Sequence, residues 1–235
     1  MEAAQQLDRT YHFILSTFVK RGYAPHYTEI AKAFSIQPEE GKRLLHELMN
    51  TKLPIWLYPH TDLIASFAPF NNLPTQYRIT VDGQQKWFAQ WGFEALAVCW
   101  VFPGKSIQID APCLDCGEPM RVVVRDGVIE SQNPNEISGY IDIPIRNWAK
   151  DWPYTWSRIH LFRSEGHVRN WSEFCPGTDE AILPLQDVMA IVSTPRHNAR
   201  LNGDYISSGA KYAPLFFERL KEVTHKALFW DPNPR

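Results

Sequence analysis

The sequence has few cysteines, little net charge and no long apolar run. Four cysteines in 235 residues are too few for the disulfide framework of a small secreted protein. The formal net charge of -2 gives no general attraction for nucleic acid or anionic membranes. No apolar run reaches spanning length, and the opening MEAAQQLDRT lacks the basic and apolar residues of a secretory signal. We therefore expect a cytoplasmic protein.

Internal repeats and low-complexity tracts are absent from the sequence as well. Hydrophobic residues make up 44% and charged residues 21%, proportions typical of a globular protein with a substantial core. The length allows one large domain or a small domain joined to a medium one. Aromatic residues reach 13%, including nine tryptophans, so an aromatic-lined cavity is an alternative to the commoner aromatic-rich core.

The first third of the chain has a helical pattern followed by a hairpin. Apolar residues recur at helical spacing over Leu7–Val19, Thr28 can cap a short second helix, and Pro38 can open a third. Residues 55–67 then have the pattern of two short strands joined by a polar turn. Three helices and a hairpin predict a winged-helix-like domain over residues 1–72.

The remainder, residues 73–235, predicts an α+β domain with a mixed or antiparallel sheet and flanking helices. Asn71–Pro74 has the composition of a linker, and Trp87–Val101 has helical length and composition after a turn at Asp82-Gly83. The expected strands are Ser106–Asp110, Met120–Arg125, Gly139–Ile143, Ser157–Phe162 and Val188–Val192. A last helix is expected from about Ala213 to Phe229.

A glutamate in the expected helix draws attention because of its aromatic neighbours. Trp87, Trp91 and Glu94 stand at i, i+4 and i+7, so a helix would place them on one face. The indoles could simply fill the core, with Glu94 as a solvated edge residue. A carboxylate beside an aromatic pocket is the alternative.

The segment Lys86–Leu96, KWFAQWGFEAL, resembles the signature of the organomercurial (alkylmercury) lyase family. The resemblance continues in PGK at 103–105, CLDCGEP at 113–119, WSRIHLF at 156–162, NW at 170–171 and MAIVS at 189–193. It covers most of residues 75–225. Because those enzymes begin with a winged-helix-like domain, the resemblance implies the same two-part fold.

The resemblance also implies where the family's reacting groups would fall. In that family two cysteine thiolates bind mercury and an aspartate protonates the departing carbon. Here the two catalytic cysteines fall on Trp91 and Trp156, a neighbouring cysteine on Ser157, and the aspartate on Glu94. An indole cannot ionise into a metal ligand. We therefore expect little or no carbon–mercury cleavage.

The expected site is a repurposed aromatic pocket around Glu94, which is apolar or suited to a cation. Its expected ligand-binding residues are Trp87, Trp91, Phe93, Trp156 and Ser157. The first hypothesis is a diverged lyase in which Glu94 acts as general acid or base on a small organic or organometallic compound, and a raised Glu94 pKa would favour it. The alternative is a non-catalytic protein that binds or senses a small ligand or a metal.

Cys113 and Cys116 form the one pair of cysteines at metal-ligand spacing. Zinc commonly takes four ligands, and no second pair of this spacing exists, so a redox pair or plain turn thiols are alternatives. Cys99 lies about 140° around a helix from Glu94, which favours a packed thiol. Apart from a possible metal at this pair, we expect no cofactor.

A small molecule is the expected partner, and the composition predicts no membrane partner. A DNA-binding role would use Lys42, Arg43 and His46 on the third helix. Three glutamates on the same short helix, Glu39, Glu40 and Glu47, oppose it, so this hypothesis ranks last. The sequence does not define the oligomeric state.

Overall fold

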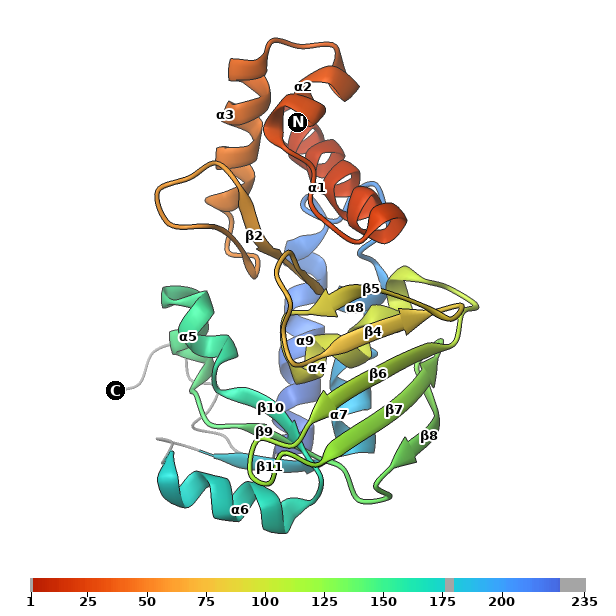
Figure 1. Cartoon of the computed structure of the whole chain (residues 1–235). Helices are drawn as coiled ribbons and strands as arrows, with labels where there is room; N and C mark the ends of the chain where they lie inside the picture. The colour runs from red at the N-terminus through yellow and green to blue at the C-terminus, as the bar shows by residue number, and fades with distance from the viewer. Residues whose placement is uncertain (1, 176–179, 225–235) are drawn as a thin grey trace, which may run out of the picture.

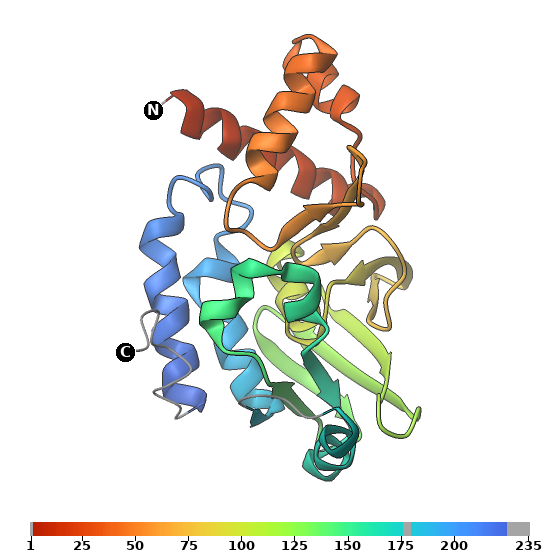
Figure 2. The same cartoon turned by 90° about the vertical axis from the view of Figure 1, so that its left-hand side faces the viewer.

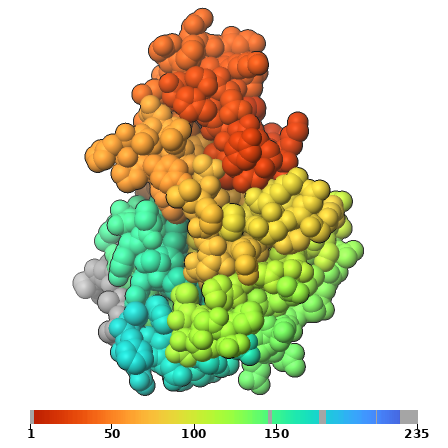
Figure 3. Space-filling view, in the orientation of Figure 1, coloured from red at the N-terminus to blue at the C-terminus, as the bar shows by residue number. Residues whose placement is uncertain are grey.

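The computed structural model describes residues 2–175 and 180–224, a group of N-terminal helices on a larger body that contains two sheets (Figure 1). Figure 3 shows the N-terminal helices as a narrower lobe above that body. Within these residues no helix is both long and apolar enough to cross a membrane. The α+β class with an antiparallel sheet, expected from the sequence, is confirmed.

The N-terminal helices are α1 (Glu2–Arg21), α2 (Tyr27–Phe34) and α3 (Pro38–Met49). Helix α1 buries the apolar stripe that predicted it, with Ile14 and Phe18 fully enclosed. The cap of α2 differs from expectation, because the side chain of His26 accepts the Thr28 backbone N–H and Glu29 completes a capping box. Thr28 therefore lies inside the helix.

Eight antiparallel strands form the larger sheet in the order β1-β2-β3-β5-β4-β6-β7-β8. They are β1 (Ile55–Leu57), β2 (Ile64–Phe67), β3 (Phe70–Asn71), β4 (Arg78–Val81), β5 (Gln84–Ala89), β6 (Ile107–Pro112), β7 (Pro119–Arg125) and β8 (Val128–Asn133). The expected hairpin is β1–β2. The linker expected at Asn71–Pro74 starts within β3, which pairs with both β2 and β5, so the hairpin continues into the sheet. A domain boundary near residue 72 stays a prediction.

The helix expected over Trp87–Val101 is wrong in its first part. Asp82 and Gly83 both have positive φ and form a tight turn, which returns the chain as β5 alongside β4. A helix begins only at α4 (Gly92–Ala97) and continues as the 3-10 turn η1 (Val98–Val101). Trp87 therefore lies on a strand, and the expected shared face with Glu94 does not exist.

A second sheet of three antiparallel strands has the order β10-β9-β11. The remaining elements are β9 (Ser138–Ile141), η2 (Ile145–Lys150), α5 (Trp152–Trp156), β10 (Ile159–Phe162), α6 (Glu165–Phe174), β11 (Ala181–Pro184), α7 (Leu185–Val192), α8 (Pro195–Asn198) and α9 (Gly209–Thr224). The strand expected at Val188–Val192 is instead part of α7, since a short apolar run fits either element. Phe229, the expected end of the last helix, lies outside the described residues.

Helix α4 occupies the centre of the body, beside α7 and β10 (Figures 1 and 2). A side chain at Gly92 would come within 2.8 Å of the Leu161 side chain and 3.0 Å of the Leu161 backbone on β10. Glycine is therefore required for this close approach. The contact brings Trp91 and Glu94 next to the segment that carries Trp156.

Candidate functional site

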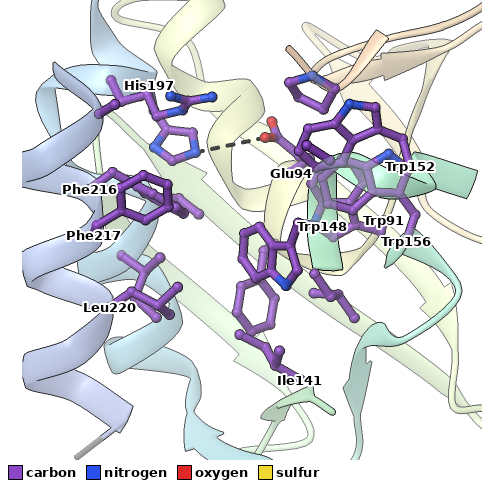
Figure 4. A pocket seen from close by; sticks show the side chains of 18 of the residues that line it. Trp91, Glu94, Ile141, Trp148, Trp152, Trp156, His197, Phe216, Phe217 and Leu220 are labelled. Carbon is purple, nitrogen blue, oxygen red and sulfur yellow. Dashed lines mark ion pairs between the residues drawn. The ribbon is translucent and has the colours of Figure 1, made fainter. Parts of the chain in front are cut away.

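A cavity of about 260 Å3 lies among α4, α5, α8 and α9 and is mostly apolar. Four indoles line it, from Trp91, Trp148, Trp152 and Trp156, and we call it the tryptophan cavity. Figure 4 shows Phe216, Phe217 and Leu220 of α9 facing these indoles across the cavity. Of the residues expected to bind a ligand, Trp91, Phe93 and Trp156 line it together with Glu94.

The indoles contact one another as well as the cavity. Trp91 and Trp156 stack with their planes 20° apart, and Trp152 stacks on Trp156 with ring centroids 4.8 Å apart. Trp148 meets Trp156 edge to face at 6.4 Å. The two positions that the resemblance gives to thiols therefore hold one stacked aromatic pair.

Glu94 is buried, and both of its carboxylate oxygens are engaged. Arg200 donates to each oxygen, at 2.6 Å to Oε1 and by a second, shorter bond to Oε2, while His197 Nε2 lies 3.7 Å from Oε1 (Figure 4). Exposed fractions are 4% for Glu94, 4% for His197 and 1% for Arg200. The carboxylate is thus held in a bidentate ion pair away from bulk water.

This ion pair decides the charge state of the site. Burial by itself raises the pKa of the Glu94 carboxyl, but the charge and hydrogen bonds of Arg200, assisted by His197, outweigh burial and hold this pKa well below its ordinary value. Burial lowers the pKa of His197 to about 4, so its imidazole is neutral at neutral pH. The raised Glu94 pKa that would favour a general acid is not found.

His197 and Arg200 are not predictable from the sequence, because nothing in their local pattern marks them as functional residues. Arg200 meets Glu94 across 106 positions of sequence. Trp148 and Trp152 were missed too, although tryptophans at 148, 152 and 156 recur every four residues, a helical spacing that could have found them. Trp156 Nε1 and Arg200 Nε are buried donors without an acceptor among the described residues.

Two expected ligand-binding residues lie outside the tryptophan cavity. Trp87 donates its Nε1 proton to the Phe18 carbonyl at 2.7 Å and thereby joins β5 to α1. Ser157 is exposed and donates to the Tyr154 carbonyl at 2.7 Å. Neither side chain lines the cavity. The expectation for Trp87 depended on helical spacing and that for Ser157 on the family resemblance, and neither defines the direction of a side chain.

The cysteines also lie away from the cavity lining. Cys113 is buried and Cys116 exposed at the tip of the β6–β7 hairpin, where His167 approaches both. Burial raises the pKa of the Cys99 thiol to about 12, in keeping with the expected packed thiol. Within residues 2–175 and 180–224, no thiol lines the tryptophan cavity.

The cations of the DNA-binding alternative are already paired with carboxylates. Lys42 and His46 each contact Asp62 at 2.7 Å, and Arg43 contacts two glutamates of its own helix. A phosphate backbone would have to displace these carboxylates. The geometry of α3 therefore lends no support to duplex binding.

Comparisons with known proteins give the chain its family. The family model for alkylmercury lyase matches residues 70–194. Alkylmercury lyases of Bacillus cereus and Clostridium butyricum are each 30% identical over 122 residues, which is 51% of this chain and 52% of each relative. The chain thus matches about half the length of these relatives.

A solved structure extends the likeness to the fold. The crystal structure of the mercury-bound form of MerB2 matches with a TM-score of 0.64 at 18% identity, covering 88% of this chain and all of that one. The family match includes Trp91, Glu94 and Trp156 and ends before His197 and Arg200. Since residues 70–194 make up more than half of the 235 residues, the chain belongs to the alkylmercury lyase family.

Proposed function

We propose that this protein binds a small, largely apolar ligand in the tryptophan cavity and does not cleave carbon–mercury bonds by the two-thiolate route. The observation that carries the proposal is the stacked indole pair of Trp91 and Trp156, at the two positions where the family resemblance implies thiols. Neither indole can become a mercury ligand. The cavity itself remains, with an apolar wall and a few polar groups, as ligand sites usually have.

The size of the cavity favours a compact ligand. A dry cavity of about 150 Å3 accommodates benzene. A cavity of about 260 Å3 accordingly suits one aromatic ring with a short substituent. Stacking and edge contacts with the indoles would stabilise such a ring in preference to an aliphatic chain of the same volume.

The charges around the cavity favour an anionic substituent. Arg200 neutralises Glu94, and His197 is uncharged at neutral pH because its pKa is lowered. Lys52 and Arg196 also line the cavity, and neither forms an ion pair with another described residue. Two unneutralised cations disfavour the organic cation considered from the sequence and favour an aryl carboxylate.

A diverged lyase is less well supported. A general acid must carry a proton at working pH, and the ion pair with Arg200 keeps Glu94 ionised. Proton transfer from Glu94 would require Arg200 to leave it first. We therefore favour the binding role over catalysis.

The test compares three probes with the same ring: phenylacetate, benzyl alcohol and benzylammonium. Tryptophan fluorescence and calorimetry should show at least about tenfold tighter binding of the anion than of the cation, as expected for a charge contribution above about 1.4 kcal/mol. Arg196→Gln should remove most of this preference. Lys105→Gln, which alters an exposed lysine paired with Asp82 outside the cavity, serves as the matched control.

Two results would contradict the proposal. Equal affinity for the three probes would contradict the proposed preference for an anion. A preference for phenylacetate that Arg196→Gln leaves unchanged would contradict it as well. Benzene release from a phenylmercury salt with excess thiol, if lost in Glu94→Gln, would restore the diverged lyase. We expect no release above the rate of the salt and thiol alone.

A further inference from the structure

The tip of the β6–β7 hairpin carries a tight turn with a cysteine at each side. The Gly117 N–H donates to the Cys113 carbonyl at 2.8 Å, and the Cys113 N–H donates to the Glu118 carbonyl at 2.9 Å. Gly117 has φ +74°, which lets the chain turn directly into β7 after Cys116. The turn brings the sulfurs of Cys113 and Cys116 together.

A third metal-binding group comes from a distant part of the sequence. A His167 ring nitrogen and the sulfurs of Cys113 and Cys116 all lie within 4.8 Å of one another. In a tetrahedral zinc site with Zn–S bonds of about 2.3 Å, ligand atoms are about 3.8 Å apart. Cys116 is exposed and His167 partly exposed, so both side chains have room for the small movement required.

The histidine is already oriented by a carboxylate. His167 Nδ1 lies 2.5 Å from Asp115 Oδ2, and Asn170 Nδ2 donates to the same oxygen at 3.4 Å. Occupation of Nδ1 in this way leaves Nε2 as the ligand atom, the arrangement common around protein-bound zinc. The loop before α6 is also held to the hairpin, because Arg163 donates to the Pro119 carbonyl at 2.9 Å.

We propose that Cys113, Cys116 and His167 bind a thiophilic divalent cation of the zinc class, with a fourth position left to water or an external ligand. Two thiolates and an imidazole match the ligand preference of zinc. This hairpin-tip cluster, as we call these three residues, does not line the tryptophan cavity. His167 provides the third ligand that the sequence pattern alone lacked.

The test uses the full-length protein, reduced, treated with a chelator and then titrated with Co2+ or Zn2+ alone. We expect one ion per chain, with a sulfur-to-cobalt charge-transfer absorption that disappears when Zn2+ displaces Co2+. Cys116→Ser alters an exposed residue and should reduce this absorption to about half or less, because one thiolate remains, and should weaken Zn2+ binding by at least about 100-fold, while circular dichroism stays unchanged. Cys175→Ser, at a cysteine outside the cluster, should bind as the unmodified protein does.

Asp115→Asn tests the positioning of His167. The variant should weaken Zn2+ binding by about 10- to 100-fold, the usual effect of losing such a partner, and should keep the charge-transfer absorption because both sulfurs remain. Failure of the reduced protein to bind Zn2+ at micromolar concentration would overturn the proposal. So would Zn2+ binding that is as tight in Cys116→Ser as in the unmodified protein, or a Cys113–Cys116 disulfide that forms readily in a protein whose reduced form takes up no metal.

Discussion

The tryptophan cavity and the hairpin-tip cluster differ in burial, in charge and in the groups they bring together. The cavity contains a carboxylate, Glu94, that is 4% exposed and paired with Arg200. The hairpin tip contains two thiols and an imidazole, of which Cys116 is exposed. An acid and two thiols are the groups that the family resemblance assigns to one centre. In this chain the acid lies in the cavity, the positions of those two thiols hold the indoles of Trp91 and Trp156, and the thiols of the hairpin tip are other cysteines.

Burial explains what each place can do. A buried charge needs a partner at all times, so the Glu94 carboxylate and the Arg200 guanidinium depend on each other. At the hairpin tip Cys116 is exposed and His167 partly exposed, so these two groups carry no such requirement and can take up a ligand from solution, although Cys113 is buried. The first region is therefore expected to be sensitive to substitution, and the second to tolerate it.

The strongest test of this difference is Arg200→Met. It should destabilise the protein by about 3 to 5 kcal/mol, because Glu94 would remain buried without its partner. Urea unfolding followed by circular dichroism measures the loss. The double variant Glu94→Leu with Arg200→Met should recover most of the stability, since apolar replacement of a whole buried pair is often neutral. A loss below about 1 kcal/mol in the single variant would contradict the assigned burial.

A pH titration tests the neutral histidine beside the ion pair. Burial lowers the pKa of His197 to about 4. Burial also lowers the pKa of His160 to about 4, although the hydrogen bond with the Ser157 carbonyl partly opposes this shift. In the unfolded chain both pKa values are near 6.5. Below pH 6.5 the unfolded chain therefore binds more protons than the folded protein does. The contribution of the two neutral histidines to the free energy of unfolding is fully present above pH 6.5 and is lost as the pH decreases. Each histidine should contribute a loss of about 2 kcal/mol between pH 6.5 and pH 5.

Variants separate the two histidines in this pH window. His197→Gln and His160→Gln should each remove about half of the pH slope measured by urea unfolding. The charged groups that face His197 are Glu94, Arg200 and Arg196; the lowered pKa of Glu94 and the raised pKa of Arg200 keep that ion pair charged in this range. An unchanged slope in His197→Gln would mean that the imidazole is not buried as described.

Some of the cavity could be predicted from the sequence and some could not. Glu94, Trp91 and Trp156 were identified by family resemblance, and the structure brings them together as that resemblance implies. The helix used to group Trp87 with them was wrong, because the Asp82-Gly83 turn joins two paired strands, a hairpin that an Asp-Gly turn after an alternating segment also indicates. Tryptophans at helical spacing lie in one helix only at Trp152 and Trp156, which belong to α5.

Contacts across long sequence separations explain the other omissions. The contact of Arg200 with Glu94 depends on the packing of α7 and α8 onto the body. The contact of His167 with Asp115 depends on the packing of α6. No period or spacing carries that information. The fold class was predictable because amphipathic helices and alternating strands are local patterns, whereas the partners that set the charge of a site are not.

Trp87→Phe shows which tryptophans belong to the cavity. The variant loses the hydrogen bond from Trp87 Nε1 to the Phe18 carbonyl, but that carbonyl still accepts the Gly22 N–H at 2.8 Å. The cost should therefore be at the low end for a buried hydrogen bond, about 1 kcal/mol, with phenylacetate binding unchanged. Trp156→Phe is the matched comparison, because it should weaken phenylacetate binding. If the two variants weakened phenylacetate binding equally, Trp87 would have to be counted among the residues of the binding site.

The smallest expected effect concerns the hairpin tip, where tolerance itself is the prediction. Without metal, Cys116→Ser should change the free energy of unfolding by less than about 0.5 kcal/mol, as expected for an exposed residue. With Zn2+ at 100 times its dissociation constant, the unmodified protein should gain about 2.7 kcal/mol and the variant almost nothing. Paired urea titrations with and without Zn2+ measure this. Only binding to the folded state can produce this gain. A stabilisation shared by both proteins would therefore place the zinc ligands outside the hairpin-tip cluster.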